Sequence, residues 1–363
     1  MELIVHWLPH SDNPTYAGVR LRCLIPHGIL ARQGHTVRIV DAASALPQRG
    51  VLVVQGKWLL DGGDAQALLL RAESLRQARA NGVRLVLDSF DNYFLNESGD
   101  EARANLLTAY RSTLDLFDAY TVSSPGLQPF MAAELSPGTA VQVIGDPIEN
   151  LRSHHSYESW LQRAQPSRWP AALNAWWELR RQRHQRRQVR QLMWFGNQGS
   201  AYAQGGMNEL QGLLPALTAL AKTQALHFTV VSNSRSRYEQ LFGGAPFSHT
   251  YRDWDRLHFL PLLAEQDLVL LPSRSTAFTA SKSNNRLLLA LAQGVPVMTD
   301  PLPDYLPWKA FCAIDEWYAL ARHVAEPAAL AQRAASAAVL INEAYSAEAI
   351  AGHWLRLFKS LAG

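Results

Sequence analysis

Residues 281–297 read SKSNNRLLLALAQGVPV. The stretch opens with polar and basic residues, continues as a run of leucine and alanine, and ends at Gly294 and a short valine-rich segment. Leucine and alanine favour helix, and glycine commonly follows the last helical residue. We therefore predict a helix over 284–293, a turn, and a buried strand over 295–299, which together form one unit of an α/β fold.

Short β-branched runs and longer helical patterns alternate in the same way along both halves of the chain. Such alternation is typical of parallel sheets covered by helices. We predict an α/β protein with two Rossmann-like parallel-sheet domains that face a central cleft, where open sheets of this class bind ligands. The predicted strands are Leu3–Trp7, Thr36–Val40, Val51–Val54, Val83–Leu87, Ala119–Val122, Val141–Ile144, Leu192–Phe195, His227–Val231, Leu268–Leu271 and Val295–Thr299.

The alternation stops once, between residues 151 and 191, where no strand pattern appears and arginine and tryptophan are frequent. We therefore predict an N-terminal domain over 1–150, an interdomain connection over 151–191 and a C-terminal domain over 192–345. A last helix over 346–363 is expected to pack back on the N-terminal domain. The connection is interpreted as a solvated linker helix because its arginines are spread around the helix. Contact with an anionic membrane surface is the alternative.

Composition is that of an ordinary globular protein. The 363 residues are 48% hydrophobic and 18% charged, so the chain is long enough for two cores and too apolar for disorder. A net charge of +3 is too small to indicate a nucleic-acid partner. Cys23 and Cys312 lie far apart and match no metal spacing, and neither a signal peptide nor a spanning segment is visible. A cytoplasmic protein is expected, with peripheral contact at the inner membrane face as an alternative.

The sequence lacks the motifs of several common classes of α/β protein. The first βα turn, Pro9–Gly18, does not contain the G-x-G-x-x-G of dinucleotide-binding folds, and neither a P-loop nor a G-x-S-x-G elbow occurs. Asp253-Trp254-Asp255 is similar to a D-x-D metal motif, yet its position before a helical pattern favours helix capping. We therefore expect no metal site and no resident cofactor.

Four short motifs in the second half carry a family resemblance. They are Met193–Asn197 (MWFGN), Asp267–Ser273 (DLVLLPS), Ser281–Arg286 (SKSNNR) and Gly294–Val297 (GVPV). Together they resemble the donor-site region of the group 1 (GT-B) glycosyltransferases, the glycogen synthase- and sucrose synthase-like group. The resemblance covers residues 192–304 well and the N-terminal half weakly. It implies metal-independent transfer of a sugar from a nucleotide-diphosphate sugar to a carbohydrate, protein or lipid-linked acceptor in glycan biosynthesis.

The donor pyrophosphate leaves with growing negative charge, which a metal-free site must neutralise. Lys282 and Arg286 are predicted to supply two positive charges one turn apart, at a helix N-terminus that itself attracts anions. A solvated helix start capped by serine or asparagine is the structural alternative. This chemistry and the resemblance predict a donor-binding set of Gly196, Asn197, Ser232, Asn233, Trp254, Ser273, Lys282, Ser283, Asn284, Asn285 and Arg286.

Polar residues at the carboxyl end of a buried N-terminal strand are the acceptor-side candidates. Asp88 or Asp91 is predicted to act as general base on the acceptor hydroxyl or to orient the sugar. The alternative is a purely structural role, in which these residues form a loop cluster and cap backbone groups. Arg20 is predicted to bind an anionic acceptor or the donor pyrophosphate. His10 and His27 are further candidates for the base, although a single histidine is more often structural.

The chain departs from the family pattern at two positions. Many members that retain the anomeric configuration carry two glutamates eight residues apart, and here those positions hold Ser281 and Leu289. The stereochemical outcome therefore does not follow from this segment. A nucleotide-sugar epimerase of the same fold and a non-catalytic, glycosyltransferase-like binding subunit remain as alternatives to a glycosyltransferase.

Overall fold

The computed structural model describes most of the chain and divides it into two compact units. The described residues are 3–41, 44–150, 177, 180, 188–199, 205–256 and 258–362. The first unit comprises Met1–Tyr157, Ala280–Ser283 and Ala344–Gly363, and the second comprises Glu158–Thr279 and Asn284–Glu343. The predicted arginine- and tryptophan-rich connection lies mostly outside the described residues.

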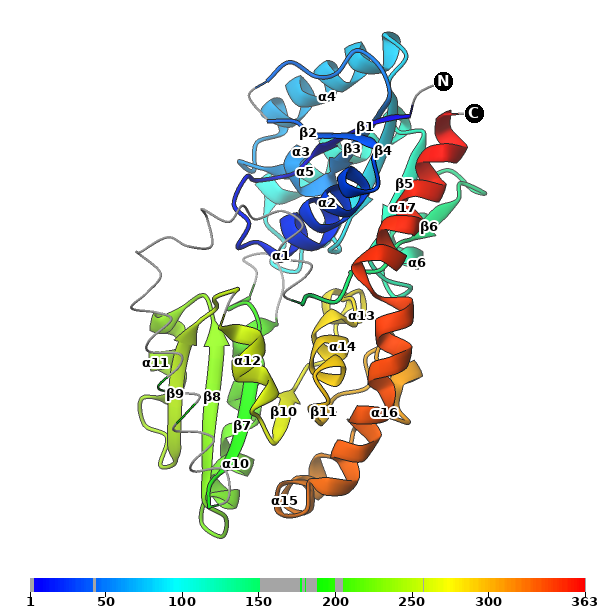
Figure 1. The fold of residues 1–363 in the computed structure, drawn as a ribbon. Coiled ribbons are helices and arrows are strands. Elements are labelled where there is room, and N and C mark those ends of the chain that lie inside the picture. The colour runs from blue at the N-terminus through cyan, green and yellow to red at the C-terminus, as the bar shows by residue number, and fades with distance from the viewer. Residues whose placement is uncertain are drawn as a thin grey trace. The chain divides into compact units, whose positions relative to one another are not determined.

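A six-stranded parallel sheet forms the centre of the first unit, in the order β2-β1-β3-β4-β5-β6 (Figure 1). Because every pair of neighbouring strands is parallel, all six carboxyl ends lie along one edge. The strands are β1 Ile4–Leu8, β2 Thr36–Ile39, β3 Val51–Gln55, β4 Arg84–Ser89, β5 Ala119–Val122 and β6 Val141–Val143.

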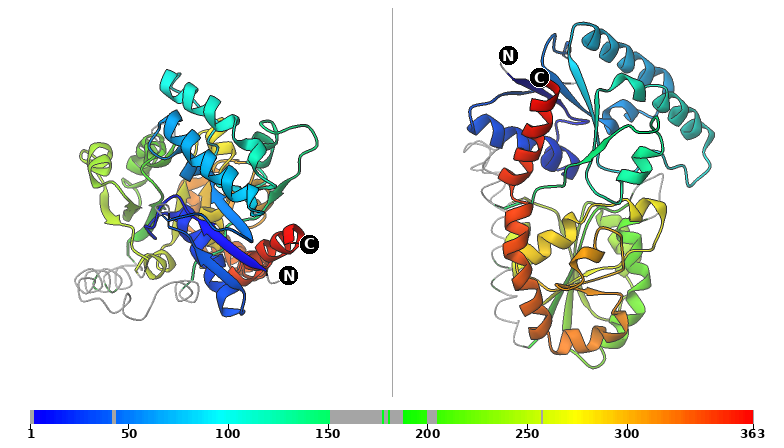
Figure 2. Two further views of the ribbon diagram at one scale, coloured as in Figure 1. Left: turned by 90° about the horizontal axis from the view of Figure 1, so that it is seen from above. Right: turned by 90° about the vertical axis from the view of Figure 1, so that its right-hand side faces the viewer.

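Side chains of a strand alternate between the two faces of its sheet. Each face of this sheet carries its own helices (Figure 2). On β3, Val51 and Val53 pack with α2 and α17, whereas Leu52 and Val54 pack with α3, α4 and α5. The strand is buried on both faces, as in other three-layer α/β domains. The helices are α1 Ala17–Val19, a π-helical turn Arg20–Leu24, α2 Ile25–Arg32, α3 Gly56–Leu60, α4 Ala65–Ala80, α5 Glu101–Arg111, a 3-10 turn Leu114–Leu116, α6 Gln128–Ala132 and α17 Ala347–Ala362.

The last helix, α17, belongs to the core of the first unit. It packs on α2 and β3, and its residue Trp354 is fully buried. The ring of Trp7 on β1 meets Trp354 at a centroid distance of 6.0 Å and Phe358 at 5.3 Å, both edge to face. Aromatic contacts of this kind add to the stability gained from burial. The end of the chain therefore completes one face of the first sheet.

The second unit contains its own six-stranded parallel sheet, in the order β12-β11-β10-β7-β8-β9. Its strands are β7 Arg190–Phe195, β8 Leu226–Ser232, β9 Ser248–Asp253, β10 Leu268–Leu271, β11 Val297–Thr299 and β12 Ala313–Ile314. Its helices are α10 Leu214–Leu220, α11 Arg235–Phe242, α12 Phe259–Ala264, α13 Ala277–Ala280, α14 Asn285–Ala292, α15 Leu320–Ala325 and α16 Ala328–Ala344, with 3-10 turns at Gly206–Gly212, Leu306–Trp308 and Trp317–Ala319.

The prediction of two Rossmann-like parallel sheets is confirmed. The predicted bounds of β5 and β10 match the structure at both ends. Strand β9 was missed because it is an edge strand in which Tyr251 alone is buried, so its sequence shows no apolar run. No helix in the described part of the chain is both long and apolar enough to cross a membrane.

Gly206 begins the 3-10 turn after the loop that follows β7, and its φ of +72° is left-handed. A Cβ here would lie 2.6 Å from the Asn197 carbonyl oxygen and 2.6 Å from the Gly199 nitrogen. Both neighbours are backbone atoms, so the loop itself must shift. We expect Gly206→Ala to lower the free energy of unfolding in urea by on the order of 1–3 kcal/mol.

Gly212, at the end of the same turn, provides the matched control. A Cβ there meets nothing within 4 Å. We expect Gly212→Ala to change the free energy of unfolding by less than about 0.5 kcal/mol. Equal stability of the two variants would contradict the steric role of Gly206.

Candidate functional site

The predicted donor residues of the second unit gather at the carboxyl edge of its sheet. Because all its strands run parallel, the residues that follow them share one edge. Gly196 and Asn197 follow β7, Ser232 ends β8 and precedes Asn233, Trp254 follows β9, and Ser273 lies two residues after β10. The structure therefore brings together at one edge residues that are spread over about 80 positions of sequence.

Hydrogen bonds connect the turn after β7 to the end of β8. The Ser232 hydroxyl donates to the Gly196 carbonyl oxygen at 2.7 Å. The side-chain oxygen of Asn233 accepts from the Gln198 N–H at 2.9 Å. Both predicted donor residues therefore shape the glycine turn, which is a supporting role that the sequence did not indicate.

Arg286 on α14 brings a positive charge to this edge. Its guanidinium donates to the Phe195 carbonyl oxygen at 3.4 Å, where β7 ends. A Cβ on Gly196 would come within 2.9 Å of the guanidinium Nη1, so glycine at this position allows the arginine to lie against the turn. The side chain is partly exposed, and its planar guanidinium is suited to phosphate oxygens.

Asp300 is a residue of this edge that sequence reasoning missed. It directly follows β11, and its Oδ2 accepts from the Ser273 N–H at 2.6 Å. Its Oδ1 accepts from the indole N–H of Trp317 at 2.7 Å. Since both oxygens are bonded, Asp300 fixes the loop after β10. An acid directly after a valine-rich strand is the signal that could have identified it.

The Asp253-Trp254-Asp255 motif divides into two roles. Asp255 accepts from the His258 N–H at 3.1 Å in the turn before α12, whereas the N-cap position of that helix is His258 itself. The capping interpretation is wrong for Asp253, which ends β9 and accepts from the Tyr251 hydroxyl at 2.8 Å. Trp254 between them is half-buried. Among the residues that the structure describes, no cluster of three or more His, Cys, Asp or Glu side chains is arranged to hold a metal ion.

The structure corrects the prediction that Lys282 and Arg286 lie one turn apart on a helix. Helix α14 begins at Asn285, so Lys282 precedes it. Residues 280–283 belong to the first unit, where the Lys282 ammonium forms an ion pair with the Asp91 carboxylate. The reason is chemical: serine and asparagine favour turns and caps over the helix interior, so the helix starts after them.

The neighbours of Lys282 are held in the first unit as well. The Ser124 hydroxyl donates to the Ser281 carbonyl oxygen at 3.1 Å. The Ser283 hydroxyl donates to Asp146 Oδ2 at 2.7 Å. Asp146 lies three residues beyond β6 and is not among the predicted site residues. The Ser283 hydroxyl, which was predicted to contact the donor, is therefore hydrogen-bonded within the protein.

Asp88, a predicted catalytic acid, is part of a buried ion pair. It is fully buried at the end of β4, and Arg22 donates to its two oxygens at 2.6 and 3.2 Å. The Thr121 hydroxyl adds a third hydrogen bond at 2.9 Å. With both oxygens bonded and no exposed surface, this carboxylate is arranged for structure and not for proton transfer to a substrate.

Asp146 is the second carboxylate beside Arg22, at 3.5 Å from Nη1. Burial raises the pKa of Asp146, and the Arg22 charge and the Ser283 hydroxyl offset part of that rise. Burial alone would lower the pKa of Arg22, but Asp88 and Asp146 together raise it. The guanidinium also donates to the carbonyl oxygens of Ile144 and Gly145. Arg22 therefore stays charged and joins helix to sheet.

Arg20, the predicted anion-binding residue, is also occupied within the first unit. It forms a two-pronged ion pair with Glu149 at 2.7 and 3.0 Å, and both side chains are buried. Its Nη1 donates to the carbonyl oxygens of Pro14 at 3.0 Å and Thr15 at 2.7 Å. The residue therefore fixes the loop after β1. Asp91, in contrast, keeps a quarter of its side chain exposed, at 25%.

The hydrogen bonds of His10 show which of its two ring nitrogens carries the proton. Gln55 donates to the Gly18 carbonyl oxygen at 2.8 Å, which turns its side-chain oxygen toward His10 Nδ1 at 2.7 Å. Nδ1 must therefore carry the proton. Burial lowers the pKa of His10 to about 4, so the ring is neutral at neutral pH. Its Nε2 is buried without a hydrogen-bond partner among the described residues, so His10 remains an acceptor-side candidate.

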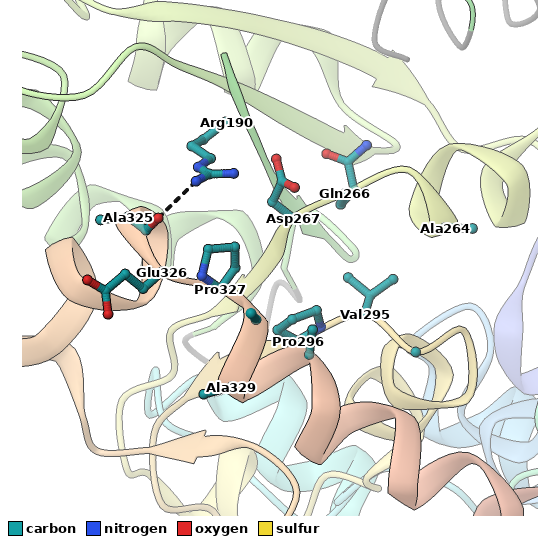
Figure 3. A pocket seen from close by; sticks show the side chains of 13 residues that line it. Arg190, Ala264, Gln266, Asp267, Val295, Pro296, Ala325, Glu326, Pro327 and Ala329 are labelled. Carbon is teal, nitrogen blue, oxygen red and sulfur yellow. Dashed lines mark hydrogen bonds between the residues drawn. The ribbon is translucent and has the colours of Figure 1, made fainter. Parts of the chain in front are cut away.

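A pocket of about 720 Å³ lies elsewhere in the second unit (Figure 3). Arg190 at the start of β7, Asp267 just before β10 and Pro296 just before β11 line it, so it lies at the amino edge of the sheet. Alanine and proline make up much of the remaining wall. None of the predicted donor residues lines this pocket, so it is separate from the candidate site.

Solved structures with the same fold have little sequence in common with this chain. HepE from Anabaena, solved in complex with UDP and glucose, is 13% identical with a TM-score of 0.62 over 99% of this chain and 100% of that one. The E. coli trehalose-6-phosphate protein bound with UDP-2-fluoro glucose is 13% identical, with a TM-score of 0.56 over 86% and 74%. A putative UDP-N-acetylglucosamine 2-epimerase from Listeria monocytogenes is 12% identical, with a TM-score of 0.51 over 98% and 95%.

These likenesses define the class of fold. Glycosyltransferases of the GT-B class are among the similar structures, and the chain has the GT-B fold. No family model and no curated protein matches the sequence. At such low identity the similarity extends to the fold alone, so function must be argued from the site.

The buried Arg22 cluster leads to a test of stability. Arg22→Met would leave Asp88 and Asp146 buried without their cation, so we expect the free energy of unfolding to fall by about 3–5 kcal/mol. Urea denaturation followed by circular dichroism measures the change. Arg76→Ala is the control, because Arg76 and Glu73 form an ion pair that is 43% and 55% exposed. Its effect should be below about 1 kcal/mol. Comparable losses in the two variants would show that the cluster contributes no more than a surface pair.

Proposed function

We propose that the protein is a metal-independent glycosyltransferase that moves a sugar from a nucleotide-diphosphate sugar to an acceptor hydroxyl in glycan or glycoconjugate synthesis. The observation that carries the proposal is Arg286, a cation held against the Gly196 turn at the carboxyl edge of the second sheet. Open α/β sheets bind ligands at this edge, and a diphosphate requires a cation there. The GT-B fold and the donor-site motifs point to the same class of ligand.

The reaction breaks the bond between the sugar's anomeric carbon and the diphosphate oxygen and forms a bond from that carbon to the acceptor oxygen. The nucleoside diphosphate leaves with an added negative charge, and the acceptor hydroxyl loses its proton. We assign Lys282 and Arg286 to the leaving diphosphate, where fixed positive charges stabilise the transition state more than the ground state. Asn284 and Asn285, at the cap and first residue of α14, are assigned to neutral hydrogen bonds with the donor.

Asp91 is the acceptor-side carboxylate of this proposal, and it takes the proton that the acceptor hydroxyl loses. Of the two predicted carboxylates it is the partly exposed one, and Lys282 pairs with it. We assign Asp88 and Arg20 to supporting roles because their charged groups are bonded inside the first unit. Two free, buried cysteines, Cys23 and Cys312, are consistent with action in the cytoplasm.

A nucleotide-sugar epimerase is the second candidate. The similarity to the putative Listeria epimerase favours it, whereas the absence of the family glutamates at Ser281 and Leu289 favours a non-catalytic binding subunit. An epimerase converts the nucleotide sugar without an acceptor, whereas a transferase releases nucleoside diphosphate in proportion to glycosylated acceptor. A binding subunit would bind the nucleotide and convert nothing. Incubation of the protein with nucleotide sugars, with and without acceptors, distinguishes the three.

The two proposed phosphate ligands predict a loss of binding. A thermal-shift screen of UDP, GDP, ADP and dTDP first identifies the diphosphate that stabilises the protein most. We expect Lys282→Ala and Arg286→Ala each to weaken binding of that diphosphate by on the order of 1.5–3 kcal/mol in calorimetry, the range for hydrogen bonds to charged groups. Lys222→Ala, which removes an exposed lysine of the second unit, should leave the affinity unchanged. Wild-type affinity in both test variants would remove the central claim.

Asp91→Asn tests the acceptor side separately. We expect kcat for transfer to fall by about 10²–10⁴, the usual contribution of a general base, while the affinity for the diphosphate does not weaken. Normal turnover of the variant with a verified acceptor would return Asp91 to a purely structural role.

Assays of the wild-type protein in EDTA test metal independence, and we expect turnover to persist without a divalent cation. Complete loss of wild-type turnover in EDTA, restored by Mg²⁺ or Mn²⁺, would contradict the metal-independent mechanism.

A further inference from the structure

The first three residues of the donor motif are each held by a different side chain of the first unit. The backbone carbonyl of one residue and the side chains of the next two make these contacts, so the segment is fixed at three consecutive positions. We call these contacts the 281–283 clamp. They are Ser124 Oγ to the Ser281 carbonyl oxygen at 3.1 Å, the Lys282–Asp91 ion pair, and Ser283 Oγ to Asp146 Oδ2 at 2.7 Å.

The Ser283 contact is connected to the core of the first unit through Asp146 and Arg22. Asp146 is buried, at 8% exposure, and its other oxygen faces Arg22, which is fully buried. Arg22 in turn is fixed by Asp88 on β4. The Ser283 hydroxyl proton is donated to Asp146, so it is not available to donate to a phosphate oxygen. In this arrangement, the Ser283 oxygen can only accept a hydrogen bond from a ligand. Phosphate oxygens are acceptors themselves, so this contact does not favour a phosphate.

We infer that Ser283 and Asp146 are positioning residues for Lys282 and do not contact the donor. The inference rests on the proposed function, in which Lys282 binds the diphosphate. With Ser281 and Ser283 held on either side, the backbone of Lys282 is fixed and only its side chain has to move. A long flexible side chain loses less entropy on binding when its base is already fixed, and the binding geometry is reached more often.

A double-mutant cycle tests whether Ser283 acts through Lys282. The ligand is the nucleoside diphosphate selected by thermal shift, and calorimetry gives its Kd for wild type, Ser283→Ala, Lys282→Ala and the double variant. We expect Ser283→Ala to weaken binding about five- to tenfold in wild type and to have no further effect when Lys282 is already absent. Ser283→Thr, which keeps the hydroxyl, should restore most of the affinity. An equal loss from Ser283→Ala in both backgrounds would overturn the inference, because it would mean that Ser283 touches the ligand itself.

Ser123→Ala is the matched control. Ser123 adjoins Ser124, is buried, and donates to the Phe90 carbonyl oxygen at 3.3 Å, outside the clamp. Its variant should keep the wild-type Kd. A loss equal to that of Ser283→Ala would show that any buried hydroxyl removed from this unit has the same effect, and would also overturn the inference.

A measurement without ligand separates the clamp from the proposed function. Hydrogen–deuterium exchange of the backbone amides over 281–285 should be faster in Ser283→Ala than in wild type and unchanged in Ser123→Ala. Unchanged exchange in Ser283→Ala would overturn the clamp whatever the protein binds. If exchange rises as expected but no nucleoside diphosphate binds to wild type, the clamp stands as a structural feature and the proposed function fails, together with the role of the clamp in positioning Lys282 for a donor.

Discussion

Arg22 lies in the interior of the first unit with no exposed surface, and a guanidinium in that position must be neutralised by carboxylates. Asp88 and Asp146 provide the negative charge, and two backbone carbonyls accept further N–H groups. The ion cluster ties the π-helical turn before α2 to the ends of β4 and β6, three elements that are distant in sequence. It also leaves one oxygen of Asp146 to hold Ser283, so the requirement to neutralise one buried cation extends to the start of the donor motif.

The second unit depends on close packing of a glycine turn. The turn after β7 brings its backbone close to an arginine from α14, and a Cβ on Gly196 would lie 2.9 Å from the flexible end of the Arg286 side chain. Ser232 then fixes the turn by donating to the Gly196 carbonyl oxygen. Within the proposed function, these contacts hold a cation and a glycine turn in place before the donor binds. Such a fixed polar environment favours an anion without rearrangement on binding.

The fold could be predicted from the sequence because it depends on local periodicity. Buried parallel strands read as short apolar runs, and β5 and β10 were predicted with their observed bounds. Strand β9 lacked that signal and was missed. The site could be predicted only in part. The residues selected at strand ends of the second unit do lie along one sheet edge, yet the partners of Asp88 and Arg20 lie 66 and 129 residues away along the chain, and no local pattern carries information over that separation. Charged residues that appeared available for substrate were therefore already paired.

The pairing of Lys282 with Asp91 has a consequence within the proposed function. In the absence of donor, each group neutralises the other, and neither is half-exposed. A nucleoside diphosphate carries more charge than one carboxylate and offers several oxygens, so it competes effectively for the ammonium. When Lys282 turns to the diphosphate, Asp91 loses its cation, and a carboxylate without a cation is a stronger acceptor for a hydroxyl proton. The same ion pair that neutralises both groups in the empty protein would thus make the acceptor-side base ready only after the donor has bound. Within the proposed function, one shared lysine thus links donor binding to activation of the acceptor-side base.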